Sequence, residues 1–368
     1  MGICYYEVKD IYGVVELKNM KKILAVMLSF VFVFASFSVL AGASGRKSAL
    51  PKSAGIEALR DEFRIDTAPE ADGYALDYAY YSPVGENDGT KYPLVIFLHG
   101  IGHADYVGAQ LDDSDFPYWA SAELQSRFSE GGAFVLLPRA PEHKLVYWSK
   151  TLIPALRSVI DDMIKKHGDN IDTSKIFIGG SSAGGEMTWD MIIAFPEYFA
   201  GAFPIAATGT VSAADTKKCS DVAIWMIASE LDPVVSYVAT TKPLWNNVIK
   251  NNAQPGSCRL SSFKSVKEPS GKGASDNHHL AKVVTYDLHM LDGSTYPDVT
   301  HEDGLGRKVT LEGEVGMISW MNSVSSDYKG DAGSDSGNIN VNGLTNFFDA
   351  IRNFFLKIVN IFQRLFGL

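Results

Sequence analysis

Ser182 occupies the central position of a Gly-x-Ser-x-Gly pattern, Gly180-Ser181-Ser182-Ala183-Gly184. A short apolar run, Lys175–Ile178, precedes the pattern and is typical of a strand, and a periodic apolar segment follows it. A serine at a sharp strand-to-helix turn can act as a nucleophile, and the flanking glycines allow the tight turn and the close helix. The alternative is a glycine-rich turn whose serines cap the next helix.

A nucleophilic serine needs an acid that orients its base, and Asp232 is the candidate acid. It lies in Ser229–Val235, directly after an apolar run that predicts a strand. Catalytic groups of open α/β sheets lie in loops at the carboxyl ends of strands, which is the position predicted for Asp232. Glu230 is the second candidate, and an ordinary turn aspartate before a proline is the structural alternative.

His301 is the candidate base. It ends the loop Asp292–His301, which follows the last predicted strand and precedes the last predicted helix of the domain. The order Ser182, Asp232, His301 along the chain matches the order of an α/β-hydrolase triad. His289 competes for the role, but it is predicted within or at the very end of a strand.

The stretch His99-Gly100-Ile101-Gly102 follows another predicted strand and supplies candidates for an oxyanion hole. A glycine turn there exposes backbone N–H groups, and we predict that those of Ile101 and Ala183 hold the oxyanion. Ala183 also opens a predicted helix, whose dipole favours negative charge.

The elements that must position these residues alternate between apolar runs and helical patterns. One predicted helical face begins at Ile153 and stops at Gly168, whereas continuous apolar runs are typical of parallel strands covered on both faces. We predict one α/β domain with a mostly parallel central sheet and helices on both faces. The predicted strands are Tyr74–Tyr81, which alternates as an edge strand would, Pro93–Leu98, Ala133–Pro138, Lys175–Ile178, Ala202–Ala206, Val222–Ala228 and Val283–Leu288.

Several motifs carry a resemblance to a known family: Tyr92–Gly100, the turn 179–185, Met187–Asp190, Phe195–Ala200 and Phe203–Ile205. The chain resembles the exported esterase branch of the α/β-hydrolases, which includes feruloyl and acetyl-xylan esterases, polyhydroxybutyrate depolymerases and relatives labelled predicted peptidases. The resemblance covers about residues 70–325 and is strongest over 92–206. It implies the α/β-hydrolase fold and hydrolysis of acyl esters by Ser182, Asp232 and His301 without a cofactor.

The substrates of that branch do not transfer to this chain directly. The stretch Cys258–Lys282 is rich in Ser, Lys and Gly and departs from the family pattern where the rim would select the substrate. Candidates for substrate contact are His99, Gly100 and Trp148, with core packing as the alternative for the tryptophan. An ester of an acyl group on plant polysaccharide, or a related small ester, is the expected substrate.

The first 43 residues predict export. Met20-Lys-Lys22 precedes the apolar run Ile23–Leu40 and the small-residue exit Ala41-Gly-Ala43, which together form a signal peptide pattern. We predict that Met20 is the true start and that cleavage follows Ala43. A retained membrane anchor is the alternative, since the run is nearly long enough to span a bilayer.

The other end carries a separate element. After the catalytic domain, 44–326, residues 327–343 form a polar linker, and polar residues at steps of three and four make 344–368 an amphipathic helix with a wide apolar face. The helix could bind a membrane surface, an envelope protein or a second copy of itself, or fold back onto the domain. The expected location is therefore outside the cytoplasm, either secreted or, if the helix acts as an anchor, retained at the cell envelope.

Charge and cysteine content narrow the function classes further. The chain has 368 residues and a formal net charge of −10 without a basic cluster, which argues against nucleic-acid binding. No His/Cys spacing fits a metal site, and His278-His279 is predicted to be solvated. Cys219 and Cys258 could form a disulfide or remain free thiols. A serine peptidase of the same fold and an inert envelope-binding protein are the rival functions.

Overall fold

A computed structural model describes residues 58–83, 89–102, 104–112, 116–141, 148–264, 279, 299–311 and 316–328. The predicted signal peptide, the strand Val283–Leu288 and the amphipathic helix 344–368 lie outside these residues. Within the described part of the chain, no helix is long and apolar enough to span a bilayer.

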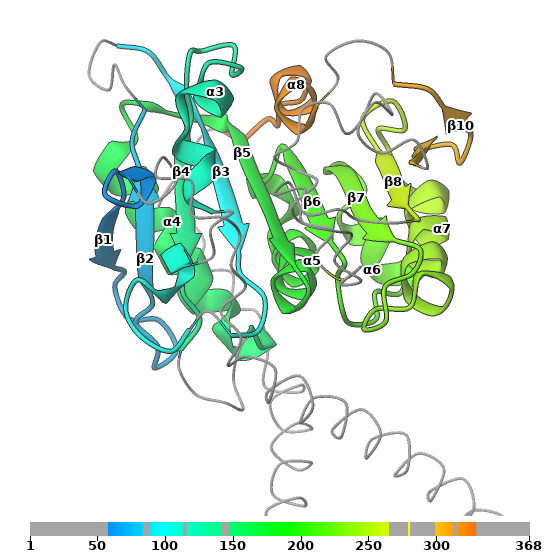
Figure 1. Ribbon diagram of the computed structural model, residues 1–368, viewed down its shortest axis with the longest axis horizontal. Coiled ribbons are helices and arrows are strands. Elements are labelled where there is room, and N and C mark those ends of the chain that lie inside the picture. Colours follow the sequence, from blue (N-terminus) through cyan, green and yellow to red (C-terminus); the bar gives the residue numbers. More distant parts are fainter. Residues whose placement is uncertain are drawn as a thin grey trace, which may run out of the picture. The chain divides into compact units, whose positions relative to one another are not determined.

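The described residues form a ten-stranded sheet in the order β1-β2-β4-β3-β5-β6-β7-β8-β9-β10 (Figure 1). The strands from β4 through β3 to β8 run parallel to one another, whereas β1 and β2 at one end and β9 and β10 at the other join the sheet by antiparallel pairing. The mostly parallel sheet is therefore confirmed. The strands are β1 Arg64–Thr67, β2 Asp77–Tyr81, β3 Tyr92–Leu98, β4 Phe134–Pro138, β5 Ile171–Ser181, β6 Gly201–Ile205, β7 Ala223–Ser229, β8 Arg259–Phe263, β9 Thr300–Asp303 and β10 Lys308–Val309.

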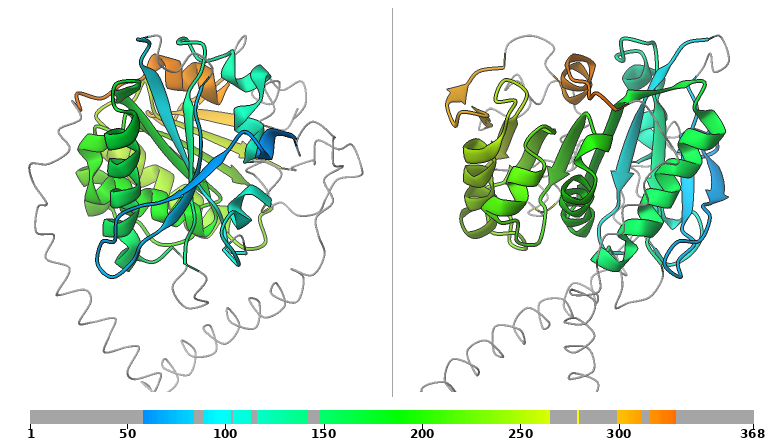
Figure 2. Two further views of the ribbon diagram at one scale, coloured as in Figure 1. Left: turned by 90° about the vertical axis from the view of Figure 1, so that its left-hand side faces the viewer. Right: turned by 180° about the vertical axis from the view of Figure 1, so that it is seen from behind.

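Helices cover both faces of the sheet, as predicted (Figure 2). The α-helices are α3 Ala122–Gln125, α4 Ile153–His167, α5 Ala183–Ala194, α6 Ala213–Lys218, α7 Lys242–Asn251 and α8 Met317–Ser323. Shorter turns are the 3-10 helices η1 Ala109–Asp112, η2 Pro117–Ala120, η3 Lys150–Leu152 and η4 Pro196–Tyr198, and the π-helix η5 Tyr237–Thr241.

Strand β3 shows why the central runs are apolar throughout. Leu94 and Ile96 belong to the core cluster that contains buried side chains of α4, α5 and α7, whereas Val95 and Phe97 belong to the cluster that contains those of α3 and α8. Successive side chains of a strand point to opposite faces, so a strand covered on both faces needs an apolar residue at every position. All seven residues of β3 are buried.

Strand β8 was not predicted from the sequence because two of its buried positions hold polar residues. It falls at the start of the stretch Cys258–Lys282, which was expected to depart from the family pattern and for which no strand was predicted. Ser261 and Ser262 are only 1% and 2% exposed, and the Ser261 hydroxyl accepts a hydrogen bond from Trp225 Nε1 at 2.9 Å. A hydrogen-bonded serine can occupy a core position without the apolar signature that sequence patterns detect.

The two cysteines of the domain are free thiols. Cys219 and Cys258 are both buried, and burial raises the pKa of Cys219 to about 12 and that of Cys258 to about 11. The sequence left both a disulfide and two free thiols open, and the structure has two free thiols.

At the end of the domain, Tyr328 stacks on Tyr198 with ring centroids 4.2 Å apart, so packing continues past the predicted boundary at 326.

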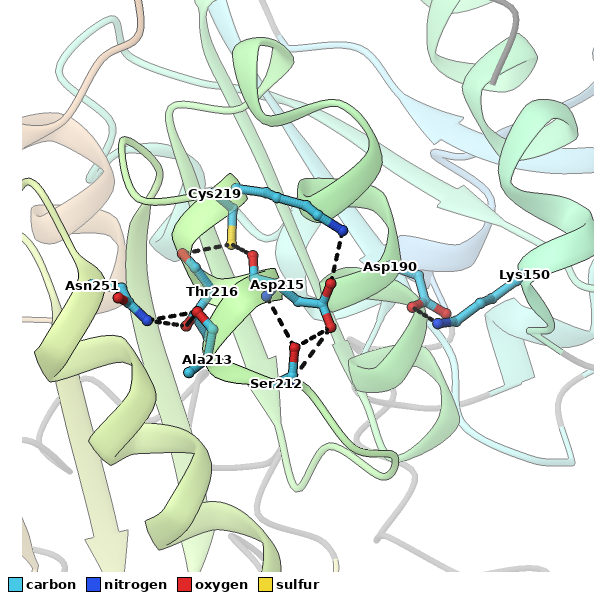
Figure 3. Close-up of polar contacts among 9 residues, drawn as sticks. Lys150, Asp190, Ser212, Ala213, Asp215, Thr216, Cys219 and Asn251 are labelled. Carbon is cyan, nitrogen blue, oxygen red and sulfur yellow. Dashed lines mark hydrogen bonds and ion pairs between the residues drawn. The ribbon is translucent and has the colours of Figure 1, made fainter. Parts of the chain in front are cut away.

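Helix α5 carries a largely buried carboxylate, Asp190, in its second half. Lys150 Nζ lies 3.4 Å from Asp190 Oδ1, and the Asp190 side chain is only 10% exposed (Figure 3). Burial raises the pKa of Asp190 to about 6, although the Lys150 charge opposes the shift. Asp215, in the capping box that begins α6, differs because hydrogen bonds from Lys218 and Ser212 lower its pKa.

We predict opposite pH dependences for these two carboxylates. The folded pKa of Asp190 lies above its unfolded value, so its contribution to stability falls as pH rises from about 4 to about 6. Asp190→Asn should therefore gain stability relative to the parent over that range, by roughly 2–3 kcal/mol if the parent conformation is kept.

Urea unfolding at pH values from about 3 to about 7 covers both windows. Asp215→Asn is the matched control and should lose stability relative to the parent as pH rises toward about 4, because the folded pKa of Asp215 is lowered below its ordinary value. Parallel profiles for Asp190→Asn and the parent would show that Asp190 does not titrate abnormally.

Candidate active site

Ser182 lies at a strained turn between β5 and α5. Its backbone angles are φ 58° and ψ −117°, a region that non-glycine residues rarely adopt. Its N–H donates to the Ile205 carbonyl of β6 at 2.9 Å, which helps to hold the turn against a strain of roughly 1–3 kcal/mol. The strand-turn-helix context predicted for Ser182 is therefore present.

The glycines around Ser182 are required by close backbone contacts. A Cβ on Gly184 would lie 2.2 Å from the Leu98 carbonyl oxygen, and a Cβ on Gly180 would lie 2.6 Å from the Gly184 carbonyl carbon. Contacts shorter than about 3 Å to backbone cannot be relieved by moving a side chain. The first turn of α5 can therefore pack against the end of β3 only if both positions are glycine.

Asp232 lies at the carboxyl end of β7, as predicted, and its carboxylate organises the turn that follows. Oδ1 accepts hydrogen bonds from the N–H groups of Val234 and Val235 at 2.8 and 2.9 Å. Oδ2 lies 2.8 Å from Nδ1 of His279, and the Asp232 side chain is only 1% exposed. A buried carboxylate bonded to an imidazole Nδ1 is the arrangement that orients a catalytic histidine.

The structure does not bring His301 to Asp232. His301 lies within β9 rather than in a loop, opposite Ser261 of β8, and its Nδ1 is 2.9 Å from the Ser261 hydroxyl oxygen. His301 is 5% exposed, whereas the described polar contacts of the Asp232 carboxylate are with the N–H groups of Val234 and Val235 and with His279. The expected partner of Asp232 is therefore replaced by His279.

The sequence patterns did not identify His279 as a candidate base because they did not predict strand β8, which precedes it. Once β8 is placed at Arg259–Phe263, His279 is a histidine in the segment after that strand, and it preserves the chain order serine, aspartate, histidine. The sequence predicted a solvated His279, but its side chain is only 14% exposed. Glu230, the alternative acid, instead accepts a hydrogen bond from the Ser262 hydroxyl at 3.0 Å.

Of the two predicted oxyanion donors, Ala183 directly follows Ser182, and Ile101 follows Gly100, which lies beside the turn. Gly100 lies beside the turn, since a Cβ on it would be 3.6 Å from Ser182 Cβ, and this brings the following residue, Ile101, to the same side of the sheet. Ala183 is the first residue of α5, so its N–H has no preceding helical turn to bond. Backbone donors beside a serine nucleophile can stabilise an oxyanion.

His99 and Trp148, two candidates for substrate contact, are buried instead. His99 is 0% exposed, and its Nε2 accepts from the Ala140 N–H at 3.0 Å, which leaves Nδ1 to donate to the Gly100 carbonyl at 2.6 Å. Trp148 Nε1 donates to the His99 carbonyl at 2.7 Å. Both side chains thus hold the backbone of the loop that carries Ile101.

Together these residues have the parts of a nucleophilic acyl-transfer site. Ser182 supplies a hydroxyl on a rigid turn, His279 is held through Nδ1 by Asp232, and backbone N–H groups lie next to the serine. The described residues contain no group of three or more His, Cys, Asp or Glu side chains that could hold a metal ion.

Known structures share this architecture. A thermostable esterase is similar at a TM-score of 0.55 and 25% identity, over 73% of this chain and 64% of that one. The acylaminoacyl peptidase of Pyrococcus horikoshii is similar at a TM-score of 0.47 and 14% identity, over 71% and 44%. The chain thus spans less than two thirds of the length of either protein. No family model matches the sequence, and no match was found among curated proteins.

The histidine pairing leads to a direct prediction. His279→Ala should lower kcat/KM for p-nitrophenyl esters by about a thousandfold or more, because Ser182 loses its base. His301→Ala should instead lower stability, since Ser261 loses a buried partner, and should leave the turnover per folded molecule within about tenfold of the parent.

Both variants should be measured for kcat/KM and for urea unfolding, so that misfolding is separated from loss of chemistry. If His301→Ala is folded but inactive while His279→Ala stays active, then His301 is the base and the assignment of His279 is wrong.

Proposed function

The chain belongs to the α/β-hydrolase superfamily, and we propose that it is a serine esterase that hydrolyses carboxylic esters through Ser182, His279 and Asp232. The observation that carries the proposal is the hydrogen bond between Asp232 and His279 at the sheet edge that also carries the strained Ser182 turn. An inert binding protein would have no need to keep a buried acid, an oriented imidazole and a strained serine together.

The proposed reaction proceeds through an acyl-enzyme. With Nδ1 bonded to Asp232, Nε2 of His279 takes the proton of the Ser182 hydroxyl as it attacks the ester carbonyl. The N–H groups of Ile101 and Ala183 stabilise the oxyanion, and His279 protonates the departing alcohol. Water then attacks the acyl-enzyme as His279 removes its proton, the bond to the Ser182 oxygen breaks, and His279 returns that proton to the serine as the carboxylic acid leaves.

The substrate proposed from the family resemblance is an acyl ester on plant polysaccharide or a related small ester. No cofactor takes part in the proposed reaction. A serine peptidase would use the same three side chains, so the triad does not separate an ester from an amide substrate.

We predict that a fluorophosphonate probe labels the full chain and does not label Ser182→Ala. Ser181→Ala is the matched control, because it removes the neighbouring hydroxyl and should keep full labelling. Equal labelling of the parent and Ser182→Ala would exclude Ser182 as the nucleophile, and an unlabelled parent would favour the inert alternative. A panel of short acyl esters, feruloylated sugars and peptide amides then separates an esterase from a peptidase.

Export and retention at the cell envelope complete the proposal. Cleavage after Ala43 predicts that the exported protein begins at Ser44, which N-terminal sequencing measures. Truncation before residue 336 should abolish sedimentation with liposomes or envelopes if residues 344–368 are the anchor. An exported protein that begins at Met1 or Met20 would contradict the predicted cleavage. Equal sedimentation of the full-length and truncated proteins would contradict anchoring by residues 344–368.

A further inference from the structure

The turn that holds Asp232 exposes large apolar side chains to solvent. Leu231 is 59% exposed, Val234 is 40% exposed and Val238, in the first turn of η5, is 80% exposed. Single exposed apolar residues are common on protein surfaces, but three within eight residues beside a proposed catalytic acid are a local concentration.

The exposure is a property of an ordered turn. Asp232 accepts hydrogen bonds from the N–H groups of Val234 and Val235, and Val235 is 4% exposed while Val234 stays outside. Ser236 then caps the next turn, since its hydroxyl oxygen accepts from the Ala239 N–H at 3.1 Å. The same hydrogen bonds that place the acid therefore keep the apolar side chains at the surface.

A fourth exposed apolar residue lies on the opposite side of Ser182. Ile101, in the proposed oxyanion loop after β3, is 45% exposed. The strand order β3-β5-β6-β7 places the Ser182 turn, which follows β5, between the ends of β3 and β7. With strands about 4.8 Å apart, these two ends are separated by about 14 Å, a span that a substrate can bridge.

Charge in this region favours an apolar ligand over an ionic one. Neither 99–102 nor 230–240 contains Lys or Arg. Asp232 is bonded to His279, and Glu230 accepts from Ser262, so both acids have partners within the fold. The exposed surface of these loops therefore has no cation that would hold a carboxylate, a phosphate or an acidic sugar.

We propose that Ile101, Leu231, Val234 and Val238 form an apolar rim that binds the hydrocarbon or aromatic part of the ester. This inference rests on the proposed function and narrows its substrate class. Esters whose acyl or alkyl group has about six carbons or more are preferred to acetyl esters of small alcohols, because each methylene that leaves water on the rim contributes favourably.

The test compares acyl chain length in the full-length protein. The parent should hydrolyse p-nitrophenyl octanoate with a kcat/KM at least about tenfold above that for the acetate. A triple variant, Leu231→Ser with Val234→Ser and Val238→Ser, should reduce the ratio of kcat/KM for octanoate to kcat/KM for acetate about fivefold or more. A parallel series of alkyl acetates shows whether the rim binds the acyl or the alcohol side.

Leu305→Ser is the matched control. Leu305 is 54% exposed. Because β9 runs antiparallel to β8, the turn after Asp303 lies at the amino ends of the parallel strands, whereas Ser182 lies at their carboxyl ends. This variant should keep the parent's ratio. The sedimentation coefficient of each variant identifies a change in self-association, and loss of a dimer with an unchanged ratio would show that the rim instead binds a second copy.

The outcomes separate this inference from the proposed function. Absence of both ester hydrolysis and fluorophosphonate labelling contradicts the serine esterase itself. Hydrolysis with equal rates along both series, or a triple variant that keeps the parent's ratio, leaves the esterase standing and overturns the apolar rim.

Discussion

The close approach of helix α5 to the end of strand β3 is the constraint on which the site depends. The contact has no space for a Cβ at Gly184 or Gly180, and it forces the intervening Ser182 into positive φ. The strain persists because the surrounding sheet and the hydrogen bond to Ile205 determine the path of the backbone. The same contact brings the N–H of Ala183 and the loop after His99 to the serine.

A second organising interaction is the carboxylate of Asp232. It bonds two backbone N–H groups of its own turn and the imidazole of His279, so one buried group shapes a loop and orients a distant histidine. His99 has a comparable role on the other side of Ser182, where its ring bonds the backbone at Gly100 and Ala140. The site is thus assembled from loops that are each held by one buried polar side chain.

Much of the fold follows from local patterns. The apolar runs that became β3, β5, β6 and β7 are detectable because strands buried on both faces have no polar positions. Strand β8 was not detectable in this way, because Ser261 and Ser262 lie at buried positions where hydrogen bonds replace apolar contact. Without β8, the prediction assigned the base to His301, which lies in β9, two strands away in the sheet from β7, the strand that Asp232 follows.

The sequence by itself identified Ser182 and Asp232, the proposed nucleophile and acid, because a glycine-flanked serine and an aspartate after an apolar run are local features tied to strand ends. It also predicted the mostly parallel sheet and named Ile101 and Ala183 as candidate oxyanion donors. Only the tertiary structure decided which histidine meets Asp232, whether Cys219 and Cys258 are bridged, and that His99 and Trp148 support a loop. Those outcomes depend on which distant side chains become neighbours, and neighbours in space are set by sheet register rather than by the pattern around each residue.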